Sequence, residues 1–360
     1  MNAPRATLPC PTLIRDGAAV LILDQTRLPH RREIRRLTTL EEVAHAIRAM
    51  QVRGAPLIGA TAAWGVAVAL AADASDSRLE EALATLAATR PTAVNLHWAL
   101  ARMAARLVPL PAGERPPAAW AEAEAILAED AAANAAIGQH GLTLLREVAA
   151  RRPGPVRVMT HCNAGWLATC GHGTALAPIY AAQAAGIPVH VWVSETRPRN
   201  QGLLTAWELA ESGIPHTLLA DNAAGHLLAR GEVDLVITGA DRVAANGDAA
   251  NKVGTYLKAL AARDNGVPFF IAAPGSTLDF ACPDGAAIPI EDRGPEEVRL
   301  VSGVDAAGQP AQLCIAPATT ACTNPAFDVT PARLITAILT ERGLAAPDRL
   351  AALYPERVAP

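Results

Sequence analysis

The sequence is poor in features that would assign it to a specialised class of protein. Aromatic residues make up 4% of the 360 residues. No CxxC pair occurs among the six cysteines, which are Cys10, Cys162, Cys170, Cys282, Cys314 and Cys322. Scattered cysteines are typical of free thiols in a reducing compartment. Residues 1–17 also lack the charged start, apolar stretch and cleavage site of a signal peptide. We therefore expect a cytoplasmic protein.

The chain also lacks an excess of charge of either sign. Its 31 basic and 35 acidic residues give a formal net charge of -4, which provides no general attraction to nucleic acid or to anionic lipid. The densest basic stretch is residues 27–36, and its arginines are typical of a solvated face. We expect no nucleic-acid partner.

One uncharged run satisfies the length criterion for a membrane span. Residues 54–72 contain no charge and are about long enough to cross a bilayer. However, the run is mostly Ala and Gly, which gain little from lipid, and it has no aromatic belt. The better interpretation is a buried helix, so we expect no membrane association.

The length and the 51% hydrophobic content allow two domains with cores of their own. Residues 38–50 open with threonines suited to cap a helix, and Pro56 suits the first turn of a second helix. An Ala-rich helical stretch follows the Pro-rich loop at 109–118. Because residues 151–155 (RRPGP) break this pattern, we predict an N-terminal, mainly helical domain over residues 1–150.

After residue 155 the hydrophobic period changes from that of helices to that of strands. Short apolar runs rich in β-branched residues alternate with stretches of helical length. The runs lie at residues 156–160, 189–193, 216–220, 233–238 and 268–273. This alternation is typical of a parallel sheet covered by helices on both faces. The predicted fold class is therefore α/β, with a Rossmann-like parallel-sheet domain over residues 151–360.

Polar or reactive residues beside glycines follow four of these runs. The four segments are residues 161–165 (HCNAG), 194–202, 239–248 and 274–279. In an open parallel sheet, ligands bind beyond the carboxyl ends of the strands, where loops and helix N-termini converge. The sequence therefore predicts a ligand site at this edge of the sheet.

Cys162 has two interpretations at this point: a reactive thiol at the site, or a small buried hydrophobe, which is the commoner role of cysteine. A catalytic pair with His161 is disfavoured, because adjacent residues of an extended segment point to opposite faces; we expect His161 to be structural. Cys162, Cys170 and His172 match no common zinc spacing. Residues 171–173 (GHG) lack the third glycine of a dinucleotide fingerprint. We expect neither a metal nor a nicotinamide cofactor.

Asp241 follows an almost wholly apolar run. A poorly hydrated carboxyl there has a raised pKa and suits a proton donor near neutrality; a turn or capping aspartate is the alternative. Beyond it, we predict a turn at residues 246–247, an N-cap at Asp248, and Asn251 and Lys252 in the first turn of a helix. That arrangement favours an anionic or hydroxylated ligand.

The segment Arg53–Pro56 follows the same logic in the first half of the chain. It places an arginine and free backbone donors at the start of a helix. Arg90 is a further candidate for the same group, although an isolated arginine is more often a surface residue.

Taken together, several segments resemble one family, the 5-methylthioribose-1-phosphate isomerases of methionine salvage, which are homologous to the regulatory subunits of translation initiation factor 2B. The segments span about residues 20–345 and read LDQTRLP, VRGAPLIGATAAWG, RPTAVNL, THCNAG, ETRPRNQG, LTAWEL, GADRVAANGDAANKVGTY, APGSTLD and NPAFDVTPARLITAILTERG. The resemblance implies a mostly helical domain followed by a Rossmann-like domain, a homodimer, a sugar-phosphate substrate and no cofactor.

The same resemblance assigns roles to individual residues. The family's catalytic pair corresponds to Cys162 and Asp241. The family's substrate contacts correspond to Arg53, Gly54, Ala55, Arg90, Gln201, Asn251 and Lys252. In the implied reaction, Asp241 donates a proton to the ring oxygen of the aldose 1-phosphate. Cys162 then either shuttles a proton between C2 and C1 or stabilises a hydride shift, and both routes stay open.

Two departures from the family pattern, Trp166 and Gly275, are expected to alter the edge of the pocket. Two rival functions also remain. The first is a non-catalytic regulatory module, which the presence of both Cys162 and Asp241 disfavours. The second is an isomerase of ribose 1,5-bisphosphate, which would need a second anion site; Trp64 and its Ala-rich surroundings favour an apolar pocket instead.

Overall fold

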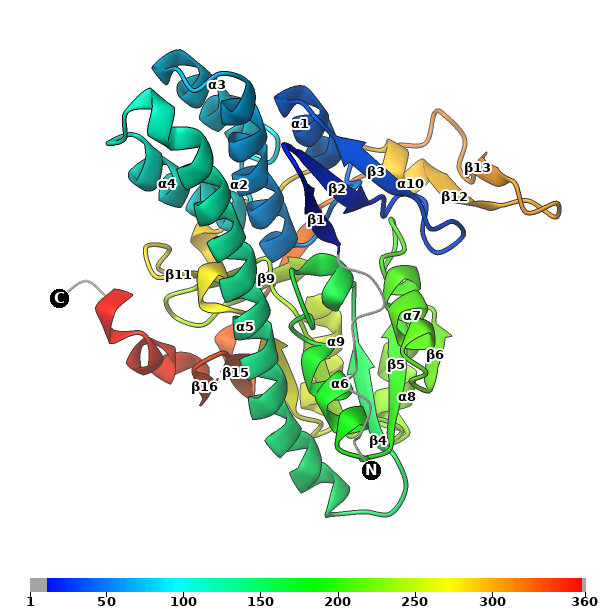
Figure 1. Cartoon of the computed structure of the whole chain (residues 1–360). Coiled ribbons are helices and arrows are strands. Elements are labelled where there is room, and N and C mark those ends of the chain that lie inside the picture. Colours follow the sequence, from blue (N-terminus) through cyan, green and yellow to red (C-terminus); the bar gives the residue numbers. More distant parts are fainter. Residues whose placement is uncertain (1–11, 358–360) are drawn as a thin grey trace.

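The computed structural model describes residues 12–357, so Cys10 lies outside the described residues. The first half opens with a three-stranded antiparallel sheet formed by β1 (Leu13–Asp16), β2 (Ala19–Leu23) and β3 (Ile34–Leu37). Helices follow: α1 (Leu40–Arg48), α2 (Ala55–Ala72), α3 (Asp76–Ala87), α4 (Val94–Leu107) and α5 (Arg115–Ala149). Helices dominate this half, and the strands at residues 13–37 are an addition that the prediction of a mainly helical domain did not specify (Figure 1).

The helix starts follow from local chemistry. Thr39 caps α1, since its hydroxyl accepts from the Glu42 amide at 3.1 Å and the Glu42 carboxylate accepts from the Thr39 amide at 3.2 Å. At α2, Gly54 is the N-cap with φ at 96°, and Pro56 occupies the first turn, as predicted. The Gly54 position requires glycine, because a Cβ there would lie 2.4–2.5 Å from atoms of Ala168.

The uncharged run forms the central helix of the first half. Among the described residues, α2 is the one helix long and apolar enough to cross a membrane, and 78% of it is buried within the molecule. It packs against α1, α3, α4 and α5. Trp64 on this helix donates to the Ala123 carbonyl at 3.0 Å and stacks edge-on against Trp120. The run is therefore explained by burial among helices.

A seven-stranded sheet occupies the second half (Figure 1). Its order is β16-β15-β10-β7-β4-β5-β6, and every neighbouring pair is parallel except β15 and β16. The strands are β4 (Val156–Thr160), β5 (Val189–Ser194), β6 (His216–Leu219), β7 (Leu235–Thr238), β10 (Phe269–Ala272), β15 (Ala337–Thr340) and β16 (Gly343–Ala345). All five predicted runs are strands of this sheet, and they are adjacent within it.

Helices cover both faces of the sheet, because successive strand residues point to opposite sides. Val158 of β4 belongs to the core shared with α5, α6 (Ala177–Ala184) and α7 (Gly202–Glu211). Met159, the next residue, belongs to the core shared with α8 (Ala223–Ala229) and α9 (Thr255–Asp264). Both faces are apolar, so the strands read as nearly continuous hydrophobic runs in the sequence.

A smaller sheet beyond β7 corrects one prediction. It consists of β11 (Leu278–Asp279), β8 (Arg242–Ala244), β9 (Ala249–Lys252) and β14 (Phe327–Thr330), in that order. Asn251 and Lys252 therefore lie on a strand, and α9 begins at Thr255 rather than at Asp248. The predicted turn at residues 246–247 joins the strands β8 and β9. Asp248 binds the amides of Gly285 and Ala332, at 2.9 and 2.8 Å.

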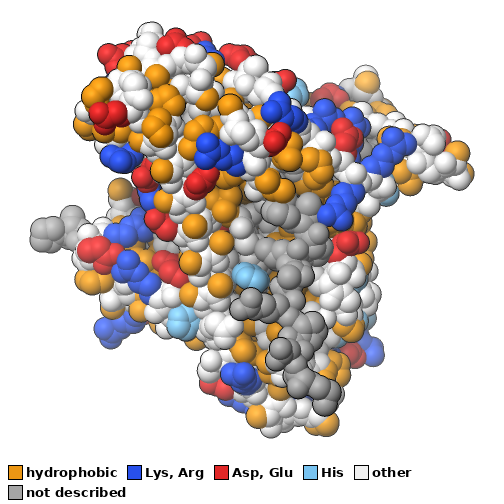
Figure 2. Space-filling view, in the orientation of Figure 1, with side chains coloured by type: hydrophobic (Ala, Val, Ile, Leu, Met, Phe, Trp, Pro, Cys, Tyr) orange, Lys and Arg blue, Asp and Glu red, His pale blue; other side chains and the backbone are white. Residues whose placement is uncertain are grey.

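Charged side chains of both signs are interspersed on the face shown in Figure 2. Within the basic stretch at 27–36, Arg35 pairs with Asp24 at 2.5 Å and Arg36 pairs with Asp16 at 2.6 Å. Arg27 lies 3.5 Å from Glu33. These arginines thus belong to a solvent-facing network of ion pairs. Nearby, β12 (Leu300–Val304) and β13 (Pro310–Cys314) form a projecting hairpin (Figure 1).

Candidate active site

The site lies where the direction of the chain through the large sheet reverses. From β4 the chain proceeds outward to β5 and β6, then returns to place β7 on the other side of β4. The loops after β4 and β7 consequently run in opposite directions from the carboxyl edge of the sheet. The space between them is the usual ligand site of such sheets. A pocket there contains all nine residues that the sequence singled out: Arg53, Gly54, Ala55, Arg90, Cys162, Gln201, Asp241, Asn251 and Lys252.

Cys162 sits two residues beyond the end of β4 with φ at 64°, a conformation that is uncommon for residues other than glycine. Its amide donates to the Thr196 hydroxyl at 2.8 Å, and its carbonyl accepts from the Thr205 hydroxyl at 2.7 Å. Burial raises the pKa of the thiol, although the nearby cations Arg53 and Lys252 act in the opposite direction. The thiol is therefore protonated at neutral pH.

Asp241 faces the pocket from the loop after β7. Its amide donates to the Ala250 carbonyl at 2.8 Å, which fixes the backbone. Its carboxylate accepts no hydrogen bond from any residue within 12–357. Burial raises the pKa of this carboxyl, against the opposing charges of Lys252, Arg90 and Arg53. The carboxyl is thus biased toward its protonated, proton-donating form.

Arg53 is held by a buried chain of hydrogen bonds that the sequence did not reveal. Its two terminal nitrogens both contact Asn163, at 3.0 and 3.1 Å from Oδ1. The Asn163 amide group in turn donates to Glu208 at 2.8 Å. Glu208 is fully buried and also accepts from the amides of Trp166 and Leu167. Burial raises the pKa of Glu208 to about 7.

A lone acid within the apolar stretch 202–210 is the sequence feature that could have pointed to a buried, hydrogen-bonded carboxyl. Buried acids are rare unless their hydrogen bonds are satisfied, and Glu208 was the acid of the LTAWEL segment. The Tyr180 hydroxyl, at 2.9 Å, is its remaining donor. Through Asn163, Glu208 thus fixes the position of the Arg53 guanidinium at the pocket.

The pocket lining carries an excess of positive charge. Its ionised side chains are Arg53, Arg90, Lys252 and Arg293, opposed by the one carboxyl of Asp241. Arg90 lies 3.3 Å from Glu291, which is not part of the lining, and Lys252 lies 5.1 Å from the centre of the Phe327 ring. Burial lowers the pKa of Lys252, whereas the nearby Cys162 and Asp241 act to raise it. Such a lining fits an anionic ligand.

Backbone amides at the start of α2 and the side-chain amide of Gln201 are available to form hydrogen bonds with a ligand. The first amides of α2, at Gly54 and Ala55, have no acceptor within the helix and lie at the positive end of its dipole. Gln201 is the N-cap residue of α7, and its Oε1 is buried without a hydrogen-bond partner among residues 12–357. An amide oxygen of this kind suits a donor from a bound hydroxyl.

The apolar part of the lining differs from what the sequence suggested. It includes Met50, Ile58 and Phe327, none of which the sequence analysis named. Trp64 is not part of it, because its ring is buried among the N-terminal helices.

The two departures from the family pattern also lie outside the pocket lining. Trp166 is 1% exposed and packs against Trp207, and Gly275 lines a neighbouring cavity with Glu341 and Tyr354. The expectation that they alter the pocket edge was therefore wrong.

His161 is fully buried behind the pocket and not in its lining. Its Nε2 lies 2.9 Å from the Val253 carbonyl, an acceptor, so this nitrogen carries the proton. Burial and the charge of Lys258 lower the pKa of His161 to about 3, so the ring is neutral. No group of three or more His, Cys, Asp or Glu side chains within residues 12–357 is arranged to hold a metal.

Comparison with known proteins places this chain in a defined family. Residues 34–347 match the model of the initiation factor 2 subunit family. The chain is 66% identical over 343 residues to a methylthioribose-1-phosphate isomerase of Dechloromonas aromatica, covering 95% of each chain. A relative from Acidiphilium cryptum with the same name is 59% identical, over 95% of this chain and 94% of the relative.

Two solved structures share the fold at a lower identity. The 5-methylthioribose 1-phosphate isomerase of Pyrococcus horikoshii superposes with a TM-score of 0.83 at 38% identity, over 99% of this chain and 100% of that one. The delta subunit of the translation initiation factor eIF-2B from A. fulgidus gives 0.79 at 35% identity, over 95% and 98%. The fold is thus common to proteins named as enzymes and to proteins named as initiation-factor subunits.

Proposed function

Because the chain belongs to the initiation factor 2 subunit family and to the methylthioribose-1-phosphate isomerases within it, we propose that its pocket performs that isomerisation. The enzyme is an aldose–ketose isomerase that converts 5-methylthio-D-ribose 1-phosphate to 5-methylthio-D-ribulose 1-phosphate in methionine salvage. The observation that carries this function is the meeting of Cys162 and Asp241 with a cation-rich lining in one pocket.

The chemical difficulty of this reaction is the phosphate on C1. It locks the sugar as a ring, so the free aldehyde that other sugar isomerases use is absent. The enzyme must first help the bond between C1 and the ring oxygen to break. A proton donor at the ring oxygen lowers the barrier to that step, because the oxygen leaves as a hydroxyl rather than as an alkoxide.

Asp241 is the acid in this scheme. Burial raises its pKa above the ordinary value, which favours the proton-donating form of the carboxyl, and no described side chain competes for that carboxyl by hydrogen bonding. The same pairing of burial and a protonated carboxyl serves general acids in other enzymes. Once the ring opens, Asp241 is left ionised close to Lys252, whose charge stabilises the anion.

Cys162 acts on the hydrogen that moves from C2 to C1. In one route the thiolate takes a proton from C2 and the thiol returns it to C1. In the other, hydride moves directly between the carbons while the thiol shields the cationic intermediate from water. In either route the C2 hydroxyl loses its proton as the ketone forms, and that proton restores the one that Asp241 gave to the ring oxygen. The raised pKa of Cys162 means that the thiol form predominates before reaction. Both routes require the sulfur beside C1 and C2.

The other lining residues bind the phosphate, the sugar hydroxyls and the methylthio group of the substrate. Arg53, Arg90 and the amides of Gly54 and Ala55 receive the phosphate, as guanidinium groups and helix N-termini commonly do. Gln201, Asn251 and Lys252 bind sugar hydroxyls. Met50, Ile58 and Phe327 offer an apolar surface to the methylthio group, with sulfur against an aromatic ring as a favourable contact.

Further features complete the proposal. The helical first half and the Rossmann-like second half act as two domains, residues 1–150 and 151–360, with the pocket built from both. The enzyme works as a cytoplasmic homodimer and needs no organic cofactor or metal for these steps. The regulatory alternative gains weight from the likeness to the eIF-2B delta subunit, yet the presence of both Cys162 and Asp241 favours catalysis.

The test is to incubate the purified protein with 5-methylthioribose 1-phosphate and follow the ketose by NMR. We expect the ketose to form with the parent protein and far more slowly with Cys162→Ser. If the folded parent leaves this substrate unchanged but converts ribose 1,5-bisphosphate, the substrate assignment is wrong. If it converts neither, the regulatory alternative takes its place.

A further inference from the structure

Behind the pocket, the loop that follows β5 supports the backbone of Cys162. Thr196 in this loop is fully buried and has φ at 67°. For a β-branched residue this conformation is an outlier that persists only when its surroundings enforce it. Cys162, at φ 64°, has the same backbone strain. The two strained residues are joined by the hydrogen bond from the Cys162 amide to the Thr196 hydroxyl, at 2.8 Å.

The Thr196 hydroxyl is oriented by its own bond. Its hydrogen is donated to the Ser194 carbonyl at 2.9 Å, which leaves the oxygen lone pairs facing the Cys162 amide. A hydroxyl can donate and accept at once, whereas a methyl group can do neither. The position therefore uses the one chemical feature that separates threonine from valine.

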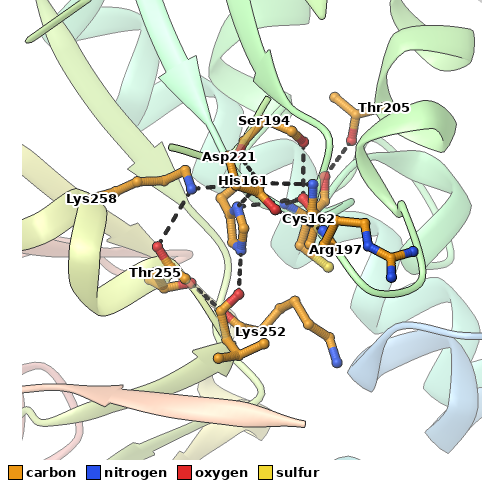
Figure 3. Close-up of polar contacts among 12 residues, drawn as sticks. His161, Cys162, Ser194, Arg197, Thr205, Asp221, Lys252, Thr255 and Lys258 are labelled. Atoms are coloured by element: carbon orange, nitrogen blue, oxygen red, sulfur yellow. Dashed lines mark hydrogen bonds and ion pairs between the residues drawn. The ribbon is translucent and has the colours of Figure 1, made fainter. Parts of the chain in front are cut away.

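Asp221, two residues beyond β6, holds the loop between Ser194 and Arg197 in place (Figure 3). Its carboxylate accepts from the amides of Thr196 and Arg197, at 2.8 and 2.7 Å, and from the Ser194 hydroxyl. Burial acts to raise the pKa of Asp221, but the Ser194 bond and the charge of Lys258 outweigh it and keep the pKa below its ordinary value. The anion is thus present to fix the loop at neutral pH.

His161 fills the space between this loop and the opposite side of the pocket. In Figure 3 its ring lies between Asp221 and the backbone next to Lys252, and Lys258 points to Asp221 from the other side. The Nδ1 of His161 is 3.4 Å from the Thr196 hydroxyl, and the Lys258 Nζ is 3.8 Å from Asp221. The support of Cys162 is therefore continuous from β6 to the pocket.

We propose that Thr196 is a positioning residue: its hydroxyl, set by Ser194 and Asp221, holds the Cys162 backbone in the left-handed conformation that aims the thiol into the pocket. Thr196 is not part of the pocket lining, so it acts on substrate only through Cys162. The catalytic consequence rests on the isomerase function proposed above. The effect on the thiol itself does not.

The test compares three variants of the full-length protein. Thr196→Val preserves the shape and removes the hydroxyl; Thr196→Ser restores the hydroxyl; Thr340→Val removes a buried hydroxyl that contacts the Gly343 carbonyl, away from the pocket. We expect kcat of Thr196→Val to fall about 10- to 100-fold with little change in KM, because the phosphate and sugar contacts remain. Thr196→Ser should recover most of the activity, and Thr340→Val should keep it.

The second readout is the reactivity of the thiol. Iodoacetamide alkylation of the peptide containing Cys162, followed by mass spectrometry across pH, should give a lower apparent pKa in Thr196→Val than in the parent, because a loosened thiol gains hydration. If the folded parent shows no isomerase activity, the proposed function fails and alkylation alone decides the role of Thr196. Should Thr196→Val not fold, Asp221→Asn takes its place, with the same direction in both readouts.

Two results would overturn the proposal. One is a folded Thr196→Val protein with the kcat and the alkylation profile of the parent. The other is an equal loss of kcat in Thr196→Val, Thr196→Ser and Thr340→Val, which would show that any disturbance of a buried threonine has the same effect.

Discussion

On one side of the pocket, the peptide of Cys162 is bound at both its amide and its carbonyl, and Asn163 beside it is bound to Arg53 and Glu208. On the other side, the backbone of Asp241 is bound by Ala250, but its carboxylate accepts no hydrogen bond from residues 12–357. We call these the thiol side, residues 161–165 and 194–202, and the acid side, residues 239–252.

The difference follows from what each group has to do. A thiol makes weak hydrogen bonds, so its position has to come from the backbone that carries it, and the thiol side supplies that support. A carboxyl that gives up a proton needs a raised pKa, which hydrogen-bond donors would lower. The acid side leaves the carboxyl without donors and relies on burial. Position is thus controlled on one side and protonation on the other.

The largest effect should come from removing the proton on the acid side. Asp241→Asn keeps the shape of the side chain but has no acidic proton, so we expect kcat to fall by about 10²- to 10⁴-fold with KM nearly unchanged. Steady-state kinetics on the purified variant measures both constants. Near-parental turnover would mean that another group protonates the ring oxygen.

The pH dependence should separate the two sides next. Asp241 must be protonated to act, and a general acid is lost as pH rises through its pKa. We therefore expect kcat to be level below the pKa of Asp241 and to decline by about tenfold per pH unit above it. Because burial raises that pKa, the decline should begin at a higher pH than it would for an ordinary aspartate. The residual activity of Asp241→Asn should lack this limb. If kcat of Asp241→Asn declines with pH in the same way, the decline comes from the ionisation of a group other than Asp241.

A smaller effect is expected from the buried support of the thiol side. In Glu208→Gln the new amide nitrogen must face the backbone amide of either Trp166 or Leu167, so the free energy of unfolding should fall by about 2 kcal/mol. Because Asn163 and Arg53 then lose their support, KM should rise. Chemical denaturation and kinetics measure the two effects.

Tyr180→Phe is the matched control for that variant. It removes one donor to Glu208 and leaves Asn163 in place, so stability should fall by about 1 kcal/mol while KM is unchanged. An equal rise in KM in both variants would show that Asn163 and Arg53 do not depend on the Glu208 carboxylate.

The smallest effect on activity should come from Trp64, which belongs to neither side. Trp64→Phe removes the bond to the Ala123 carbonyl within the helical core, so the free energy of unfolding should fall by about 1 kcal/mol with kcat and KM unchanged. Thermal melting and kinetics provide the measurements. A change in KM would indicate that Trp64 does contribute to binding the methylthio group.

The sequence predicted mainly apolar strands better than it predicted polar ones. The short apolar runs identified β4, β5, β6, β7 and β10, and Cys162 and Asp241 were singled out because they follow two of these runs. By contrast, β8 and β9 carry Arg242, Asn251 and Lys252 and form no apolar run. Without such a run the strand signal is absent, and a helix was predicted to begin at Asp248 instead.

Contacts between distant segments explain the other differences. Glu208 meets Asn163 and Tyr180 across the fold, and no local pattern in the sequence records that convergence. Trp166 and Gly275 stand close to site segments in the sequence, yet the chain turns them toward Trp207 and Tyr354. Their closeness to site residues in the sequence therefore suggested, incorrectly, that Trp166 and Gly275 lie at the pocket edge.

The most direct test of separate roles for the two sides is the isotope effect on kcat with substrate deuterated at C2. If Asp241 opens the ring and Cys162 then assists transfer of the C2 hydrogen, Cys162→Ser should make that transfer limiting and show a larger isotope effect than the parent. Asp241→Asn should make ring opening limiting and show a smaller one. The same isotope effect in both variants, or the reverse order, would contradict the division of labour between the thiol side and the acid side.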